Sequence, residues 1–269
     1  MTRTWHLFLD RLPLKGSWNM AVDEFLLSRL TDRPSTSLRF YQWERPTASL
    51  GCSQDAAQAV DADFCRRRGV DIVRRITGGK LVLHDREVTY ALVSSDDSFF
   101  SMTVTESYRR ISQALSLGLQ KMGLRPELAG TPPAEYSRGT LPCFSLPGRD
   151  ELQAEGRKIV GSAQKRTGKM FLQHGSIPLE HDEALLRSIT RLPAEGERMR
   201  MTSLSELLGS QVSFDWAVER LQEGFAEFFG AAFERLAFTP EERDAIRRLQ
   251  RQKYEDAGWT FHRLLAPAS

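Results

Sequence analysis

Hydrophobic and polar positions divide the chain into a strand-rich middle and helical ends. Near the start, the alternation in "WHLFLD" (5–10) predicts a short strand. "SLRFYQW" (37–43) alternates as expected for a strand with one buried face. Between them, apolar residues recur at helical spacing and predict a helix. Its apolar face consists of Trp18, Val22, Phe25, Leu26 and Leu30.

Two further helices are predicted before the middle of the chain. Residues 55–69 form an amphipathic pattern ended by Gly69, and residues 71–76 then predict a strand. Residues 105–123 carry a longer apolar stripe that also ends at a glycine, so we expect this helix to cover a sheet. The stripe consists of Tyr108, Ile111, Leu115, Leu119 and Met122.

The second half of the chain changes from strands to helices. Residues 150–179 alternate between two glycine-containing turn signals, which predicts a three-stranded meander. The last third is helical, with capping boxes at Ser203/Glu206 and at Thr239/Glu242. Strands in the middle and helices at the ends predict an α+β fold.

Composition narrows the class of protein. With 269 residues, 41% hydrophobic and 27% charged, the chain is long enough for a compact protein with a sizeable core. Its apolar stretches are too short to span a membrane, and the N-terminus lacks a signal-peptide pattern, so we expect a cytoplasmic protein without a membrane partner. A net charge of +2 gives no indication of nucleic-acid binding.

"RRITGGKLVLHD" (74–85) contains a Gly-Gly-Lys that resembles the end of a phosphate-binding loop. Such a loop needs a glycine where this chain has Arg74, and a serine or threonine where it has Leu81. A strand-forming run also follows, where that motif would open a helix. The two glycines must therefore serve another purpose between two strands.

Three cysteines without a CxxC pair suggest neither a disulfide framework nor a metal site. Cys65 lies on an apolar helix face, where a thiol acts as a small hydrophobe. Cys52 ends a strand, where it could line a pocket or merely pack. Cys143 lies in the glycine- and proline-rich "SRGTLPCFSLPGRD" (137–150), which favours a loop thiol near a ligand, with packing against Phe144 as the alternative.

A nucleophilic thiol needs a neighbour that favours its thiolate. The candidates are His84, His174 and Lys158. Strand alternation alone makes Lys158 a solvated charge on the same side as Ser162. The small residues that follow it favour a site instead, because they let backbone approach a ligand closely.

Three motifs in order, "RRITGGKLVLHDREVTY", "GRKIVGSAQKR" and "LQHGSIPL", resemble the lipoate-protein ligase and octanoyltransferase family, which is related to biotin protein ligases. "WNMAVDEFLL" and "KYEDAGWTF" are similar to that family too, so the resemblance covers most of the chain. It implies a biotin/lipoate protein ligase-like catalytic domain with a mixed central sheet. We expect this domain at 32–230, with 1–31 and 231–269 as helical extensions packed on it.

The resemblance also implies roles for individual residues. "PCF" ahead of "GRKIVGSAQ" is similar to the cysteine-bearing loop of the ligase-like octanoyltransferases, which makes Cys143 the acyl-thioester nucleophile and Lys158 the group that lowers its pKa. The double glycine would line an acyl pocket. For His84 and His174, a purely structural role is an equal alternative to positioning the substrate. The residues expected to bind substrate are Arg75, Gly78, Gly79, His84, Gly161, Ser162, Ala163, His174 and Gly175.

The family contains ATP-dependent ligases and transferases. Ligases typically read Gly-Gly-Gly and Gly-Asn where this chain has Gly78-Gly79-Lys80 and Glu87-Val88, which favours the transferase. The implied reaction moves octanoyl from octanoyl-acyl carrier protein to a lysine of a lipoyl domain, such as glycine cleavage H protein, without a cofactor. The alternatives are an ATP-dependent lipoate ligase, an amidotransferase between lipoyl proteins, and a non-catalytic acyl-binding module.

Overall fold

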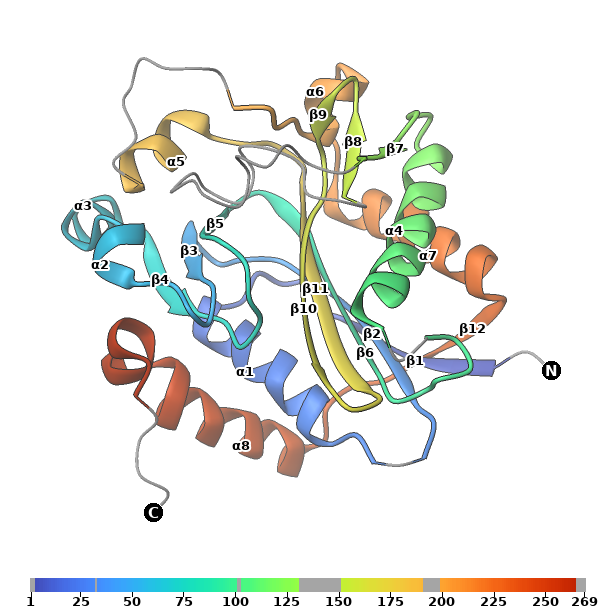
Figure 1. Cartoon of the computed structure of the whole chain (residues 1–269), viewed down its shortest axis with the longest axis horizontal. Helices are drawn as coiled ribbons and strands as arrows, with labels where there is room; N and C mark the ends of the chain where they lie inside the picture. Colours follow the sequence, from blue (N-terminus) through green and yellow to red (C-terminus); the bar gives the residue numbers. More distant parts are fainter. Residues whose placement is uncertain (1–2, 32, 101–102, 131–150, 191–198, 265–269) are drawn as a thin grey trace.

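A six-stranded mixed sheet forms the centre of the protein (Figure 1). The computed structural model describes residues 3–31, 33–100, 103–130, 151–190 and 199–264. Strand β1 pairs in parallel with both β2 and β12, and the other neighbours in the sheet are antiparallel. In sheet order the strands are β10 (Gly161–Thr167), β11 (Met170–Pro178), β6 (Glu87–Ser94), β2 (Thr36–Tyr41), β1 (Arg3–Leu9) and β12 (Ala231–Arg235).

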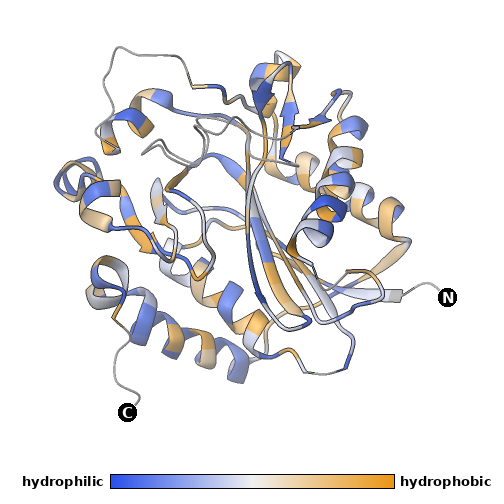
Figure 2. Cartoon of the chain, viewed as in Figure 1, coloured by the Kyte–Doolittle hydropathy of each residue, from blue (hydrophilic) through white to orange (hydrophobic). Residues whose placement is uncertain are grey.

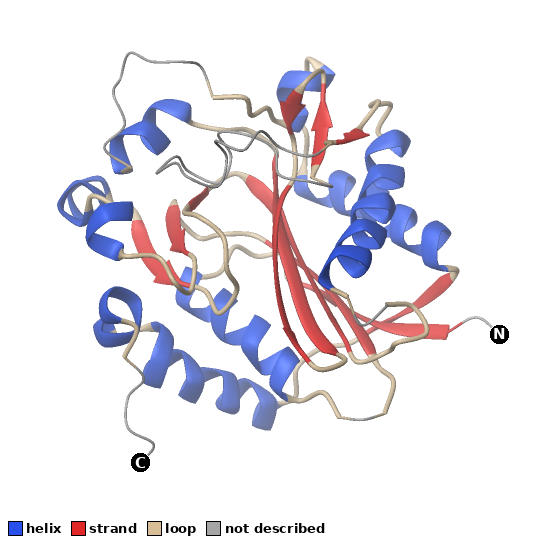
Figure 3. Cartoon of the chain, in the orientation of Figure 1, coloured by secondary structure: helices blue, strands red, loops and turns tan. Residues whose placement is uncertain are grey.

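Helices cover both faces of this sheet (Figure 3). α4 (Val104–Lys121) and α7 (Phe214–Phe229) pack on one face, and α1 (Gly16–Ser28) and α8 (Pro240–Leu249) on the other. Neighbouring residues of β2 therefore enter different cores: Phe40 packs on the α7 side and Tyr41 on the α1 side. The fold class and the helices predicted at 18–30 and 105–123 are confirmed, whereas β2 is buried on both faces, not one.

A second, three-stranded sheet lies beside the first. Its order is β4 (Asp71–Arg74), β3 (Thr47–Leu50) and β5 (Val82–His84), so β3 lies between the two strands that flank the double glycine. The helix predicted at 55–69 is split into α2 (Ala56–Ala59) and α3 (Ala62–Arg68), because Asp61 caps the Phe64 amide and starts a new helix. It ends as expected at Gly69, which has a positive φ of 67°. Cys65 is fully buried in the core behind α3, as predicted.

The predicted meander at 150–179 is wrong. β8 (Leu152–Ala154) and β9 (Arg157–Lys158) form a hairpin in a third sheet with β7 (Glu127–Leu128), whereas β10 and β11 form a hairpin in the central sheet. The chain changes sheets after Lys158, whose backbone bonds to Arg200 and Thr202. Because the chain changes sheets there, strand alternation does not continue from Lys158 to Ser162. These two residues therefore do not share a strand face.

The two ends of the chain contribute strands as well as helices. β1 and β12 pair at the edge of the central sheet, so the segments 1–31 and 231–269, predicted as helical extensions, each contain a strand beside their helices. β12 has β1 as its hydrogen-bonded neighbour in the sheet, and β1 lies between β12 and β2. The boundary at 32–230 stays a prediction.

The last third also contains α5 (Glu183–Ile189), α6 (Leu204–Leu208), and the π-helical turns η2 (Gln250–Tyr254) and η3 (Gly258–His262). The capping box at Thr239 is complete, whereas the Glu206 carboxylate bonds to Arg157 and Thr202 instead of closing its box. Polar and apolar residues alternate along α8 (Figure 2), as expected for a helix with one face on the core. None of the described helices is long and apolar enough to cross a membrane.

Candidate active site

A pocket lies where the central sheet meets the second sheet. It contains most of the residues expected to bind substrate. Apolar walls come from Met20 of α1, Tyr41 of β2 and Val82 of β5, and small residues of β10 and β11 form another side. Its lining residues are Met20, Tyr41, Ser49, Arg75, Val82, His84, Thr89, Gly161, Ser162, Ala163, His174, Gly175 and Ser176.

The β10–β11 hairpin gives the pocket a backbone-lined wall. Ser162 pairs with Gly175 across the two strands. A Cβ at Gly175 would lie 2.5 Å from Ser162 Oγ and 2.7 Å from the Gly161 carbonyl oxygen. Glycine is therefore required here by close packing, and the wall presents little side chain to a ligand.

Gly78 and Gly79 are not among the described residues that line the pocket. Arg75 explains their place in the structure, because its guanidinium holds their turn: Nη2 donates to the carbonyl oxygens of Gly78 (2.8 Å) and Lys80 (2.7 Å), and Nε also donates to Gly78. Nη1 donates to the Ser49 carbonyl (2.8 Å) and hydroxyl (3.0 Å). All five donors of Arg75 thus have partners within the protein, which makes it a clamp on the turn.

The turn needs glycine for two reasons. Gly79 has a φ of 90°, a region that residues with a Cβ rarely adopt. Its carbonyl oxygen also lies only 2.0 Å from where a Cβ would stand at Gly51, so the end of β3 and the turn pack backbone to backbone. The glycines shape the edge of the pocket and do not form its wall.

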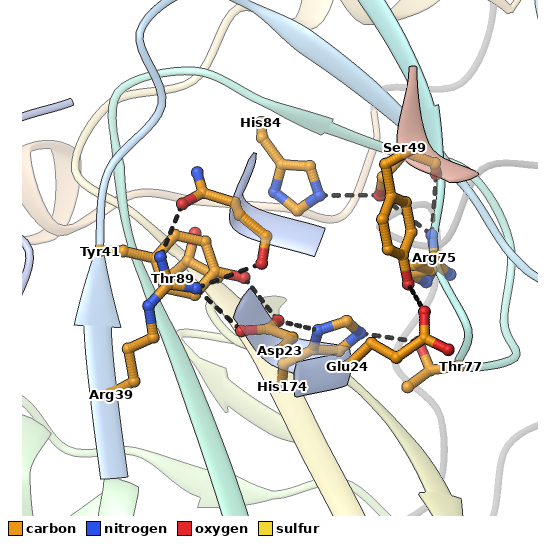
Figure 4. Close-up of polar contacts among 12 residues, drawn as sticks. Asp23, Glu24, Arg39, Tyr41, Ser49, Arg75, Thr77, His84, Thr89 and His174 are labelled. Atoms are coloured by element: carbon orange, nitrogen blue, oxygen red, sulfur yellow. Dashed lines mark hydrogen bonds and ion pairs between the residues drawn. The ribbon is translucent and has the colours of Figure 1, made fainter. Parts of the chain in front are cut away.

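His84 lies in a line of three polar groups, Glu87, His84 and Ser49, that ends in the pocket. Its Nδ1 is 2.8 Å from Glu87 Oε1. Its Nε2 is 2.8 Å from Ser49 Oγ (Figure 4). The ring stacks on Trp43, with centroids 4.0 Å apart and planes 12° apart. Trp43 Nε1 and the Ser176 hydroxyl also donate to Glu87. Glu87 is therefore held by several donors, and it fixes the orientation of the imidazole.

His174 lies in a second line with the same order of groups. Its Nδ1 is 2.8 Å from Asp23 Oδ2, and its Nε2 is 2.7 Å from Thr77 Oγ1 (Figure 4). Asp23 is buried and also accepts hydrogen bonds from Arg39 (2.9 Å) and Tyr41 (3.0 Å). Burial lowers the pKa of His174 although Asp23 opposes the shift, so the ring is neutral at pH 7.

Four residues of these lines were not identified from the sequence: Asp23, Ser49, Thr77 and Glu87. Asp23 lies 151 positions from His174, and no local pattern relates the two. The sequence indicated these carboxylates only through the motifs near them: Asp23 lies in "WNMAVDEFLL", and Glu87 follows "LHDR". Carboxylates that bond histidines are a common means of fixing the tautomer of the ring.

Lys158 does not line the pocket and is not a solvated charge. Its side chain is fully buried, and Nζ lies 2.6 Å from Glu151 Oε2. The pair is expected to reduce the field that the ammonium exerts on any other group, because the carboxylate carries the opposite charge. Cys143 lies outside the described residues.

The described part of the pocket combines an apolar wall suited to an alkyl chain with two carboxylate–histidine–hydroxyl lines. Burial of methylene groups against Met20 and Val82 stabilises a bound chain by about 0.8 kcal/mol each. Each hydroxyl at the end of a carboxylate–histidine line can pass a proton to the imidazole. This arrangement suits acyl binding and acyl transfer.

Comparisons with known proteins agree with this chemistry. The chain is 38% identical to the protein named octanoyltransferase LipM of Carboxydothermus hydrogenoformans, over 96% of this chain and 98% of that protein. It is 40% identical to the octanoyltransferase LipM of Kyrpidia tusciae, over 97% of this chain and 100% of that protein. A crystal structure of lipoate-protein ligase A bound with ATP superposes with a TM-score of 0.83, 25% identity, and coverage of 97% and 100%.

A second solved structure, with lipoic acid bound, has a similar fold. The putative lipoate protein ligase of T. acidophilum with bound lipoic acid has a TM-score of 0.82, 23% identity, and coverage of 96% and 99%. The family described as "Lipoyl protein ligase A/B catalytic domain" matches residues 15–226, which include both histidine lines and the pocket. The chain therefore belongs to the lipoyl protein ligase A/B catalytic domain family.

Proposed function

We infer that the protein is an octanoyltransferase of lipoate biosynthesis, which attaches an octanoyl group to a protein. The observation that carries this function is the 38–40% identity, over nearly the whole of both chains, to proteins named octanoyltransferase LipM. The pocket supports it, since an apolar wall beside two histidines suits an uncharged alkyl chain with a reactive carbonyl at its end.

The finer steps of the reaction are part of the proposal. Octanoyl-acyl carrier protein is the donor, and Cys143 thiolate attacks its thioester to form an octanoyl-enzyme. One thioester replaces another, so this step needs no ATP. The ε-amine of a lipoyl-domain lysine then attacks, and a stable amide forms. Glycine cleavage H protein is the acceptor we favour. One structural neighbour supports this class of partner, since it is described as an archaeal lipoate protein ligase and its E2 lipoyl domain.

Lys158 is proposed to favour the Cys143 thiolate. Its ammonium is the buried cation nearest in sequence to that loop among the expected site residues, and Glu151 holds it in place. The pairing with Glu151 limits how strongly Lys158 can favour the thiolate. The Glu151 carboxylate offsets part of the charge, so the pKa shift that Lys158 produces is expected to be smaller than that from an unpaired ammonium.

The test is the intact mass of the protein after incubation with octanoyl-acyl carrier protein and no ATP. We expect one octanoyl adduct, lost in Cys143→Ala and kept in Cys65→Ser. Transfer to H protein should fall at least about 100-fold in Cys143→Ala. Cys65→Ser is the matched control, because that thiol is buried in a core and its loss affects stability only.

Three results would contradict the proposal. Transfer that persists in Cys143→Ala would remove the covalent step. Transfer that requires ATP and free octanoate or lipoate would instead identify an adenylating ligase. An adduct that passes only between two lipoyl proteins would make the enzyme an amidotransferase.

A further inference from the structure

The two histidine lines differ in one respect that bears on catalysis. Both run from a carboxylate through an imidazole to a hydroxyl, but of the two hydroxyl residues only Ser49 lines the pocket. Thr77, at the end of the other line, is fully buried and directly precedes Gly78. It opens the turn that contains Gly78 and Gly79, called the glycine turn from here on. One line therefore ends in the pocket, and the other ends outside it, at the turn that Arg75 holds.

The direction of the hydrogen bonds in the Ser49 line follows from its partners. The Trp43 indole can only donate to Glu87, and the Ser176 hydroxyl donates to it as well. Glu87 thus acts as an acceptor, and the imidazole hydrogen lies on His84 Nδ1. In the neutral ring, His84 Nε2 then carries a lone pair, and the Ser49 hydroxyl donates to it across 2.8 Å.

Arg75 contacts the Ser49 hydroxyl as a second partner. Its Nη1 donates to Ser49 Oγ at 3.0 Å, so the oxygen accepts from a cation while its hydrogen points at His84. Nearby positive charge favours loss of that hydrogen. The charged and titratable groups that surround His84 in this part of the structure are Glu87 from β6, Arg75 from the segment after β4, and His174 from β11.

We propose that Ser49 is a catalytic residue that takes the proton from the amine attacking the acyl group in the pocket, with His84 and Glu87 as the positioning residues behind it. A lysine amine that attacks a carbonyl carbon becomes positively charged and must lose a proton. The N–H proton moves to Ser49 Oγ as the Ser49 hydrogen moves to His84 Nε2, and Glu87 stabilises the imidazolium. As the bond from carbon to the leaving group breaks, the proton returns through Ser49 to the leaving atom.

This role rests on the proposed function only in that an amine attacks an acyl group. An acyl-thioester and an acyl-adenylate both require the same proton to leave the amine. The experiment can therefore use whichever donor supports turnover in the wild-type protein, octanoyl-acyl carrier protein or ATP with octanoate, and H protein as the acceptor. If the octanoyltransferase assignment is wrong, turnover will require ATP and octanoate in place of octanoyl-acyl carrier protein. If the relay is wrong, the Ser49 and Glu87 variants will show it with either donor.

Ser49→Ala is the decisive variant, because it removes the hydroxyl and keeps the fold. Arg75 still bonds the Ser49 backbone carbonyl at 2.8 Å, so the glycine turn stays clamped. We expect kcat for amide formation to fall about 100-fold, in the range typical of general-base catalysis, with KM for the acceptor changed less than about 3-fold. The solvent deuterium isotope effect of the wild type should disappear, and Ser49→Thr should restore part of the rate.

Glu87→Gln tests the tautomer. The amide can donate to Nδ1 and force the hydrogen onto Nε2, which would then donate to Ser49 and block proton uptake. We expect a loss of rate at least as large as that of Ser49→Ala, with the acidic limb of the pH–rate profile moved or lost. Thr77→Val is the matched control: it removes the corresponding hydroxyl of the other line, and whatever rate remains should keep the wild-type isotope effect and pH profile.

Folding of each variant is checked by thermal melting and near-UV circular dichroism. A folded Ser49→Ala protein with kcat within about 3-fold of the wild type and the same isotope effect would overturn the proposal. So would a Thr77→Val protein that loses the isotope effect in the same way, because the relay would then not be specific to the line that reaches the pocket. If Glu87→Gln does not fold, Ser49→Ala and Ser49→Thr decide the question.

Discussion

At the scale of single residues, His174 shows how the fold controls a charge. The ring is buried between Asp23 and Thr77, and burial lowers its pKa below the ordinary value of 6.5. The unfolded chain therefore binds a proton at a pH where the folded protein does not. The free energy of unfolding falls as the pH drops below about 6.5, down to the lowered pKa, and it is unaffected by this group above pH 7.

His174→Gln should remove this part of the pH dependence. Gln can still donate to Asp23 but does not titrate. We expect the free energy of unfolding of the wild type to fall more than that of the variant between pH 7.5 and 5.5, by up to about 1.4 kcal/mol. The measurement is urea denaturation at both pH values, with the exposed His262→Gln as the control for loss of a histidine. Equal pH dependence in wild type and His174→Gln would show that the folded ring titrates normally.

The residues of the pocket divide into those that sequence reasoning can find and those it cannot. His84, Ser162 and His174 lie in motifs, and the structure places all three in one pocket. Asp23 could not be assigned a role, because it becomes the partner of His174 only through packing between segments 151 positions apart. Glu87 is only three positions from His84, but the sequence does not show that its side chain turns toward the ring. Alternation alone indicates a solvated charge at Lys158, whereas its burial depends on Glu151 and on a change of sheet that alternation does not reveal.

At the scale of elements, periodicity predicts a helix well when one core covers it. α4 has its stripe on the core shared with α7, and its predicted bounds differ from the observed ones by a residue or two. The strands of residues 150–179 were predicted as strands but assigned to one meander. Register and pairing partners depend on contacts far along the chain, and turn residues alone do not determine which sheet a hairpin joins.

The glycine turn after β4 permits a test with neighbouring glycines. Gly79 has a φ of 90°, and we expect Gly79→Ala to destabilise the protein by about 1–2 kcal/mol through backbone strain. Gly78 has no heavy atom within 4 Å of an added Cβ, so Gly78→Ala should change stability by less than about 0.5 kcal/mol. Urea denaturation of both variants measures the difference. Equal stabilities would show that the turn relaxes around the new side chain.

At the scale of the whole molecule, the C-terminal segment is tied to the pocket through Arg74. Trp259 of η3 donates from Nε1 to the Arg74 carbonyl (2.9 Å), and the Arg74 guanidinium donates back to the carbonyls of Trp259 and Thr260. Nη1 of Arg74 also donates to the Gly51 carbonyl at 2.8 Å. Gly51 in turn packs on the Gly79 carbonyl, so the end of the chain supports the turn that Arg75 clamps.

Trp259→Ala should therefore loosen the glycine turn as well as the C-terminal segment. The ring packs on the core beside α1, and Lys253 Nζ lies 4.3 Å from its centroid, so we expect the free energy of unfolding to fall by about 3 kcal/mol. Phe261→Ala, in the same turn but 36% exposed, is the matched control and should cost less than about 1 kcal/mol. Hydrogen exchange separates local loosening from global destabilisation. Amides of the glycine turn should exchange faster in Trp259→Ala by a factor larger than that for the buried strand β6, since the turn loses a direct support and β6 does not. If both regions change by the same factor, the C-terminal segment stabilises the fold as a whole and has no particular connection to the pocket.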